Sequence, residues 1–289
     1  MRKVLLFVCL LMAGMTVNVN AAKQKAKHVI LIGMDGWGAY SVSKADIPAI
    51  KSLMTNGCYT LHSRSVLPSS SAINWASMFM GVGTELHGYT TWGSKTPEIP
   101  SREVNERGIA PTIFSVLREQ RPKAEIGCLY EWPGIKYLVD TLAMSYQYQT
   151  PGYAKAPTAL CEAAEKYIIE KKPELLAICF EEPDHTGHTK GHDTPAYYQM
   201  LKELDGYVER ILQAIKKAGI WDDTIIIMTA DHGGIKTGHG GKTLREMEIP
   251  FIISGKNVRK GMEIKESMMQ YDKIGRAHAE LQSQVRISY

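Results

Sequence analysis

Cysteine is scarce in this sequence, and its scarcity argues against two classes of protein. Five cysteines in 289 residues are too few for a disulfide scaffold. No two of them form a C-x-x-C pair of the kind found in redox motifs and zinc–cysteine sites. Cys9 lies in the first apolar segment. The other four leave room for one or two disulfides whose pairing the sequence does not assign; they are Cys58, Cys128, Cys161 and Cys179.

Long apolar runs and blocks of like charge are also missing. No apolar stretch reaches the roughly 20 residues that a membrane-spanning helix needs, so we expect no stable membrane anchor. The net charge of +4 is spread without a Lys/Arg block, which argues against a nucleic-acid polymer as partner. No internal repeat or low-complexity linker divides the chain. A composition of 44% hydrophobic and 22% charged residues is that of one globular domain.

The two ends of the chain differ from its centre. Arg2 and Lys3, the apolar run 4–12 and the small-residue site ending at Ala21 predict an export signal over residues 1–21. The mature protein is then expected in the periplasm or outside the cell. Residues 274–283 resemble a translated sequencing adapter, so 274–289 are predicted to be a non-native or disordered tail. The folded domain is expected over residues 22–273.

Short β-branched runs alternate with helical patterns along this domain. The continuous apolar character of the runs predicts strands buried on both faces, at residues 28–34, 125–130, 175–180, 224–229 and 249–254. Helices are predicted near 47–56, 72–80, 111–118, 159–171 and 194–217, and surface loops at 91–107 and 145–157. This alternation predicts an α/β fold with a mostly parallel central sheet flanked by helices.

An aspartate follows three of the predicted strands. Asp35 ends the first apolar run, Asp184 follows the run that ends at residue 180, and Asp231 follows the run that ends at residue 229. Ligands of open α/β sheets bind beyond the carboxyl ends of the strands. The three carboxylates are therefore expected to meet at one edge of the sheet.

Histidines accompany two of these aspartates. His188 follows Asp184 by four residues, a spacing that lets a loop or a first helical turn direct both side chains to one ion. His232 directly follows Asp231, and the glycines after it permit the sharp turn that adjacent ligands need. His239 stands between glycines on the same loop. Carboxylates and imidazoles without cysteine suit zinc or manganese, so the sequence predicts a site for two divalent metal ions.

The serines before the second predicted helix are candidates for a nucleophile. The run from Pro68 to Asn74 places a hydroxyl near a helix N-terminus, which offers N–H groups and positive potential to a phosphate. A serine at this place is often only the N-cap of the helix. Beside the metal-ligand clusters, a metal-activated serine nucleophile is the better interpretation.

In this order, the motifs resemble the alkaline phosphatase superfamily, and most closely its type I phosphodiesterase/nucleotide pyrophosphatase branch. The resemblance covers about residues 28–273. The segments that carry it are Ile32-Gly33-Met34-Asp35-Gly36, the Pro68 to Asn74 run with Gly81, His87 and Gly88, then Glu131-Trp132-Pro133-Gly134, Glu182-Pro183-Asp184 through His188, and Asp231-His232-Gly233. Such relatives share an alkaline phosphatase-like fold.

The resemblance implies two zinc ions and a serine nucleophile. One zinc would be held by Asp184, His188 and His239, and the other by Asp35, Asp231, His232 and the Ser71 oxygen. Ser71 is chosen because it lies three residues before Asn74, with Ser70 as the fallback, and Asn74 would bind a phosphoryl oxygen. The branch usually has Thr at the nucleophile and Pro before the Asn, where this chain has Ser71 and Ile73.

The activity that the resemblance implies is that of an exported, metal-dependent phosphoric ester hydrolase, acting on a small phosphate ester or nucleotide. Two alternatives remain. Only six residues separate His232 from His239, where the branch commonly carries a long insertion, so the more open site also suits an alkaline phosphomonoesterase. The second alternative is a non-catalytic metal- or phosphate-binding module, although a pure binder needs no activated hydroxyl.

Overall fold

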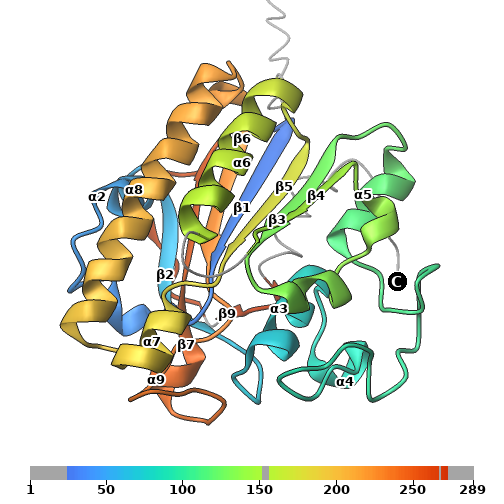
Figure 1. Cartoon of the computed structure of the whole chain (residues 1–289). Helices are drawn as coiled ribbons and strands as arrows, with labels where there is room; N and C mark the ends of the chain where they lie inside the picture. Colours follow the sequence, from blue (N-terminus) through green and yellow to red (C-terminus); the bar gives the residue numbers. More distant parts are fainter. Residues whose placement is uncertain (1–24, 152–155, 267, 273–289) are drawn as a thin grey trace, which may run out of the picture.

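The computed structural model describes residues 25–151, 156–266 and 268–272. The predicted export signal at 1–21 and the predicted tail at 274–289 lie outside the described residues. In the described part of the chain, one nine-stranded sheet forms the centre and helices cover both of its faces (Figure 1). Among the described helices, none combines the length and the hydrophobicity that a transmembrane span requires.

The elements follow the chain in a regular alternation. The strands are β1 (His28–Met34), β2 (Gly57–Arg64), β3 (Ile126–Tyr130), β4 (Tyr146–Gln149), β5 (Leu175–Phe180), β6 (Thr224–Thr229), β7 (Glu248–Gly255), β8 (Met262–Glu263) and β9 (Met268–Met269). The helices are α2 (Pro48–Thr55), α3 (Ser71–Met80), α4 (Thr84–His87), α5 (Ile113–Gln120), α6 (Ala156–Lys171), α7 (Asp184–Lys190), α8 (Pro195–Lys217) and α9 (Leu244–Met247).

The strand order is β4-β3-β5-β1-β6-β7-β2-β8, with β9 also paired to β2. The five strands from β4 to β6 run parallel, whereas β7 is antiparallel to both β6 and β2. The prediction of a mostly parallel α/β sheet flanked by helices is therefore confirmed. All five predicted strands are present, with bounds shifted by at most one residue.

Two parts of the sheet differ from the sequence prediction. The predicted surface loop at 145–157 is wrong in part, because Tyr146–Gln149 form the edge strand β4 and α6 begins at residue 156. β4 is short and mostly exposed, so it lacks the apolar run by which the other strands were found. β2 was not predicted either, since its outer half mixes polar and partly exposed residues.

The strands bury side chains on both faces of the sheet. In β1, Ile30 and Ile32 pack with α2, α6 and α8 on one face, while Val29 and Leu31 pack with α3 and α5 on the other. This alternation follows from the two-residue period of a strand, and it explains the continuous apolar run. The four described cysteines are buried and free, so the disulfides left open by the sequence do not form within this part of the chain.

Local signals in the sequence fix the ends of the helices that border the carboxyl edge. α8 begins at Pro195 behind Thr194, whose side chain accepts a hydrogen bond from the Tyr197 N–H. α3 ends at Gly81, whose φ of +68° favours glycine. The N-terminus of α3 and the helix α7 lie beside the carboxyl ends of β1, β5 and β6 (Figure 1).

Candidate metal centre and nucleophile

Three buried aspartates meet at the carboxyl ends of β1, β5 and β6. Asp35 directly follows β1, Asp231 lies two residues after β6, and Asp184 is the first residue of α7, four residues after β5. β1 lies between β5 and β6 in parallel register, so the three chain exits are neighbours. The topology thus brings together carboxylates that lie as much as 196 residues apart in the sequence.

Backbone contacts hold these exits close together. The Asp184 N–H donates to the Asp35 carbonyl at 3.1 Å, and the Gly36 N–H donates to Asp231 Oδ1 at 3.1 Å. Gly36 has a φ of +68°, and a Cβ at this position would lie 2.5 Å from Asp184 Oδ1, so the position requires glycine. The indole N–H of Trp75, on α3, donates to Asp35 Oδ2 at 3.1 Å and fixes that carboxylate.

Three histidines present the same ring nitrogen to the aspartates. In each, Nδ1 lies 2.8–3.0 Å from a backbone carbonyl oxygen. Because a carbonyl oxygen only accepts hydrogen bonds, Nδ1 carries a proton in each ring, and whenever the ring is neutral its Nε2 keeps the lone pair. A partner that fixes the tautomer in this way is typical of metal-binding histidines. The pairs are His188 with Thr237, His232 with Gly233, and His239 with Ser69.

The Nε2 atoms of these histidines point to the carboxylates. His188 Nε2 lies 3.0 Å and His239 Nε2 3.7 Å from Asp184 Oδ2. His232 Nε2 lies 3.3 Å from Asp35 Oδ1 and 3.3 Å from Asp231 Oδ2. The rings of His232 and His239 stack with centroids 3.7 Å apart, so the group around Asp35 and the group around Asp184 are in direct contact.

Two sets of side chains bring their ligand atoms within 4.8 Å of one another. The first is Asp35, Asp231 and His232, which are three of the four ligands predicted for one zinc ion, the fourth being the Ser71 oxygen. The second is Asp184, His239 and His232. His188, predicted as a ligand beside Asp184 and His239, contacts Asp184 but is not part of the second set, and its side chain is 45% exposed. Its role as a ligand stays a prediction.

The charges of the site fit a cation. One oxygen of each aspartate is buried without a hydrogen-bond partner: Asp35 Oδ1, Asp184 Oδ1 and Asp231 Oδ2. Such atoms are costly unless something positive or protonated meets them. Burial, then the charges of Asp231 and Asp184, raise the pKa of Asp35 well above its usual range, and burial, then Asp184, raise the pKa of Asp231 to about 7. Divalent metal ions would relieve this repulsion.

Asp184 has the opposite electrostatic balance. Burial alone would raise its pKa, but the hydrogen bond from His188 and the nearby His232 and His239 hold the pKa of Asp184 below its usual range. His188 is the ion-pair partner of Asp184, and its hydrogen bond to Asp184 raises the pKa of His188 to about 9. We call the side of the site with Asp184, His188 and His239 the Asp184 half, and the side with Asp35, Asp231 and His232 the Asp35 half. The Asp184 half carries a positive charge at His188, whereas the Asp35 half has no such charge.

A hydroxyl lies beside the Asp35 half. Ser71 is the first residue of α3, and its Oγ lies 3.2 Å from His232 Nε2. Ser70 is the N-cap in extended conformation and makes no side-chain capping bond. Ser69 ties this segment to the histidine loop, because its Oγ donates to the Gly241 carbonyl at 2.6 Å and its carbonyl accepts from His239. Of these serines, Ser71 is the one whose hydroxyl contacts His232, a predicted metal ligand.

Asn74, on α3, is bonded to the segment that leads to Ser71. Its side chain is fully buried, and its Nδ2 donates to the carbonyls of Val66, Pro68 and Ser70 at 3.1–3.3 Å. Its Oδ1 accepts from the Val66 N–H at 2.8 Å. The amide therefore holds the segment before Ser71 in place. The Asn74 amide thus bonds to backbone groups in this structure, and its contact with a phosphoryl oxygen stays a prediction.

The sequence prediction did not include His192, which lies against the site. Its side chain is fully buried, and its Nε2 lies 3.5 Å from Asp184 Oδ1. Burial lowers the pKa of His192 to about 4. The spacing of four residues from His188, behind Gly191, is a signal that would have drawn attention to it.

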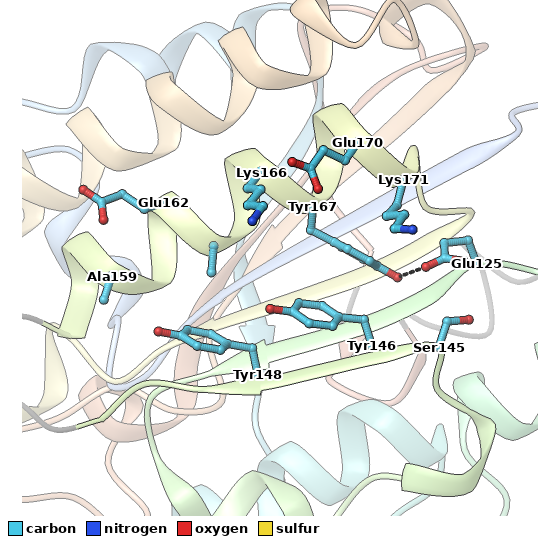
Figure 2. A pocket seen from close by; sticks show the side chains of 11 residues that line it. Glu125, Ser145, Tyr146, Tyr148, Ala159, Glu162, Lys166, Tyr167, Glu170 and Lys171 are labelled. Atoms are coloured by element: carbon cyan, nitrogen blue, oxygen red, sulfur yellow. Dashed lines mark hydrogen bonds between the residues drawn. The ribbon is translucent and has the colours of Figure 1, made fainter.

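A pocket of about 660 Å³ lies elsewhere, between the edge strand β4 and α6 (Figure 2). Tyr146 and Tyr148 line it from β4, and Tyr167 lines it from α6, with its hydroxyl donating to Glu125 Oε1 at 2.8 Å. None of the aspartates and histidines described above lines this pocket. The candidate metal ligands and Ser71 therefore lie outside this pocket.

Sequence comparisons agree with the resemblance seen in the motifs. A family model described as type I phosphodiesterase/nucleotide pyrophosphatase matches residues 29–278. A bis(5'-adenosyl)-triphosphatase of Mus musculus is 24% identical over 226 residues, which are 74% of this chain and 48% of that protein. Ectonucleotide pyrophosphatase/phosphodiesterase family member 3 of Mus musculus is 26% identical over 71% of this chain and 24% of its own length. The chain spans about half the length, or less, of such curated relatives.

Solved structures show the same fold at low identity. The murine ectonucleotide pyrophosphatase/phosphodiesterase 5, an inactive variant in complex with AMP, superposes with a TM-score of 0.71 at 18% identity, over 90% of this chain and 95% of that chain. A 2-O GAG sulfatase superposes with a TM-score of 0.72 at 14% identity, over 92% of this chain and 72% of that chain. The fold is alkaline phosphatase-like, as predicted.

Proposed function

The chain belongs to the type I phosphodiesterase/nucleotide pyrophosphatase family, and we propose that it is an exported, metal-dependent phosphoric ester hydrolase with a serine nucleophile. The observation that carries the proposal is a convergence. Three buried carboxylates with unpartnered oxygens, three histidine Nε2 atoms and the Ser71 hydroxyl all meet at one edge of the sheet.

We propose that two zinc ions bind here. Asp35, Asp231, His232 and the Ser71 oxygen would hold one, and Asp184, His188 and His239 the other. Bound zinc would supply Lewis acidity, which lowers the pKa of a hydroxyl and polarises a phosphoryl oxygen. The mixed nitrogen and oxygen donors favour zinc over magnesium, which prefers oxygen ligands in an octahedral shell.

Ser71 would carry the chemical step. The Ser71 hydroxyl would give up its proton as Oγ bonds to phosphorus, while the bond from phosphorus to the ester oxygen breaks and the leaving group takes up a proton to become the alcohol. Water would then attack the phosphoserine, the bond from phosphorus to Oγ would break, the Ser71 oxygen would regain a proton, and the phosphate product would leave. The position of Ser71 at the N-terminus of α3 supports this role, because the helix directs N–H groups and positive potential to a phosphate there.

The substrate class follows from the relatives and from the site. A murine relative is named a bis(5'-adenosyl)-triphosphatase, and another murine family member was solved with AMP, so we propose a small nucleotide or phosphate ester as substrate. An alkaline phosphomonoesterase is the second candidate. The short segment between His232 and His239 favours it, because an Ile235–Gly238 bridge closes a tight turn there and builds nothing large over the site.

Side-by-side assays on 4-nitrophenyl phosphate and bis(4-nitrophenyl) phosphate test the proposal and separate the two candidates. We expect hydrolysis of at least one ester to disappear when a chelator strips the metal, and zinc to restore it better than magnesium. Metal analysis should find close to two zinc ions per chain. Activity retained in excess chelator, or a purified protein without transition metal after zinc loading, would refute the metal site.

A further inference from the structure

We propose that His192 is a positioning residue of the metal site: its ring holds the Asp184 carboxylate in the orientation needed to bind a metal. Asp184 directs Oδ2 to His188 and His239, and directs Oδ1 to His192, whose Nε2 lies 3.5 Å away. This inference rests on the proposal that Asp184 is a metal ligand. It adds a residue that the ligand set does not contain.

The Asp184 carboxylate and the His192 ring both have buried polar atoms without a hydrogen-bond partner. Asp184 Oδ1 is buried without a hydrogen bond, and so are both ring nitrogens of His192 within the described residues. A buried imidazole N–H and a buried carboxylate oxygen that face each other at 3.5 Å need only a small shift to form a hydrogen bond.

The surrounding backbone is shaped around the His192 ring. A Cβ on Gly187 would lie 2.4 Å from the ring, and a Cβ on Gly234 would lie 2.3 Å from it. Gly187 is on α7 with Asp184, and Gly234 is on the loop that follows β6. The Tyr197 ring, on α8, packs against His192 with its centroid 5.4 Å from that of the imidazole. The ring therefore has one well-defined place, next to Asp184.

The same residue links the two segments that carry the ligands. The His192 N–H donates to the Lys236 carbonyl at 2.6 Å, in the loop between His232 and His239. The adjacent Thr237 carbonyl accepts from His188 Nδ1. An outer partner that orients a ligating carboxylate typically changes metal affinity about 10- to 100-fold when it is removed.

Two substitutions separate positioning from packing. His192→Phe keeps an aromatic ring between the two glycines but removes the N–H, whereas His192→Gln keeps an N–H donor at about the reach of Nε2. The probes are Zn²⁺ in competition with a chromogenic chelator, and the visible absorption spectrum of the Co²⁺-loaded protein. His62→Gln, at an exposed histidine whose side chain is 71% exposed, serves as the control.

We expect His192→Phe to weaken the binding of one zinc ion by about 10- to 100-fold and to change the Co²⁺ spectrum, and His192→Gln to restore most of both. The melting temperature in chelator checks that both variants fold. Wild-type zinc affinity and Co²⁺ spectrum in His192→Phe would overturn the inference, as would a His192→Gln variant no better than His192→Phe. A wild-type protein that binds zinc but hydrolyses no ester contradicts the proposed function alone, since these readouts do not depend on turnover.

Discussion

The two halves of the site are built in different ways. The Asp35 half comes from the ends of two adjacent parallel strands and is fully buried, with two carboxylates and one histidine. The Asp184 half comes from the helix α7 and a glycine-rich loop, and one of its histidines, His188, is half exposed. The first half therefore gathers two carboxylates in a buried place, whereas in the second half the charge of Asp184 is paired with His188.

The two halves also differ in what holds their side chains in place. The Asp35 half is rigid because strands position it, but its repelling carboxylates need a cation. The Asp184 half is compensated electrostatically, because His188 and the other histidines lower the pKa of Asp184 despite its burial. We infer that without metal the Asp35 half is the more strained of the two.

The largest expected effect tests the hydroxyl of the Asp35 half. Ser71→Ala should lower turnover by about 10³-fold or more, because no other hydroxyl replaces the nucleophile, while zinc content stays close to that of the wild type. Steady-state kinetics on nitrophenyl esters and metal analysis measure the two quantities. Ser70→Ala is the matched control, one residue away, and should stay active. Near wild-type turnover in Ser71→Ala, or loss in Ser70→Ala instead, would show that the assignment is wrong.

A second test compares the halves directly in the metal-free protein. Asp184→Asn should lower the free energy of unfolding by about 1–3 kcal/mol, because it removes the charge that His188 pairs with. Asp231→Asn should cause no loss, since Asn keeps the oxygen that accepts from Gly36 and removes a charge that opposes Asp35. Urea unfolding in chelator measures both. Equal losses in the two variants would contradict the electrostatic difference between the halves.

A third test concerns a buried histidine outside both halves. His87 is fully buried, with Nδ1 accepting from the Tyr89 N–H at 3.0 Å and Nε2 donating to Ser77 Oγ at 2.9 Å. Both nitrogens are used by the neutral ring. Burial lowers the pKa of His87 to about 4 in the folded state, against about 6.5 in the unfolded chain.

Between pH 6.5 and 4 the unfolded chain binds a proton at His87 that the folded protein does not, so stability falls as the pH falls. The loss should reach about 3 kcal/mol at most by pH 4. His87→Gln, which keeps one donor and one acceptor, should flatten this part of the profile of unfolding free energy against pH. Because other buried histidines titrate in the same range, the difference between variant and wild type is the quantity to measure. Parallel profiles would rule out His87 as a source of acid sensitivity.

The smallest effect is expected at the opposite edge of the sheet. Tyr146 lines the pocket between β4 and α6 (Figure 2), and no aspartate or histidine of the site lines that pocket. Tyr146→Ala should leave kcat and KM on nitrophenyl esters unchanged within error, because it touches no group of the proposed mechanism. A change in kcat of more than about threefold, about 0.6 kcal/mol, would show that the two edges are coupled.

Several features of the fold were predictable from the sequence because they depend on local patterns. The apolar runs of β1, β5 and β6 gave their bounds almost to the residue, since strands buried on both faces leave a continuous signal. β4 lacked this signal, because an exposed edge strand of four residues buries too little to need an apolar run. The parallel order followed from the alternation with helices, and it led correctly to one edge with three aspartates.

The sequence alone supplied the candidate site residues, because carboxylates, imidazoles and a hydroxyl are properties of single side chains. Their partners were decided only by the tertiary structure. Which histidine nitrogen faces inward depends on carbonyls up to 170 residues away, as with His239 and Ser69. The engagement of Asn74 with the loop before Ser71, and the burial of His192 against Asp184, arise from packing between segments that no local pattern relates. Chain chemistry is local, but hydrogen-bond partners and electric charge act through space, and only the folded chain sets those distances.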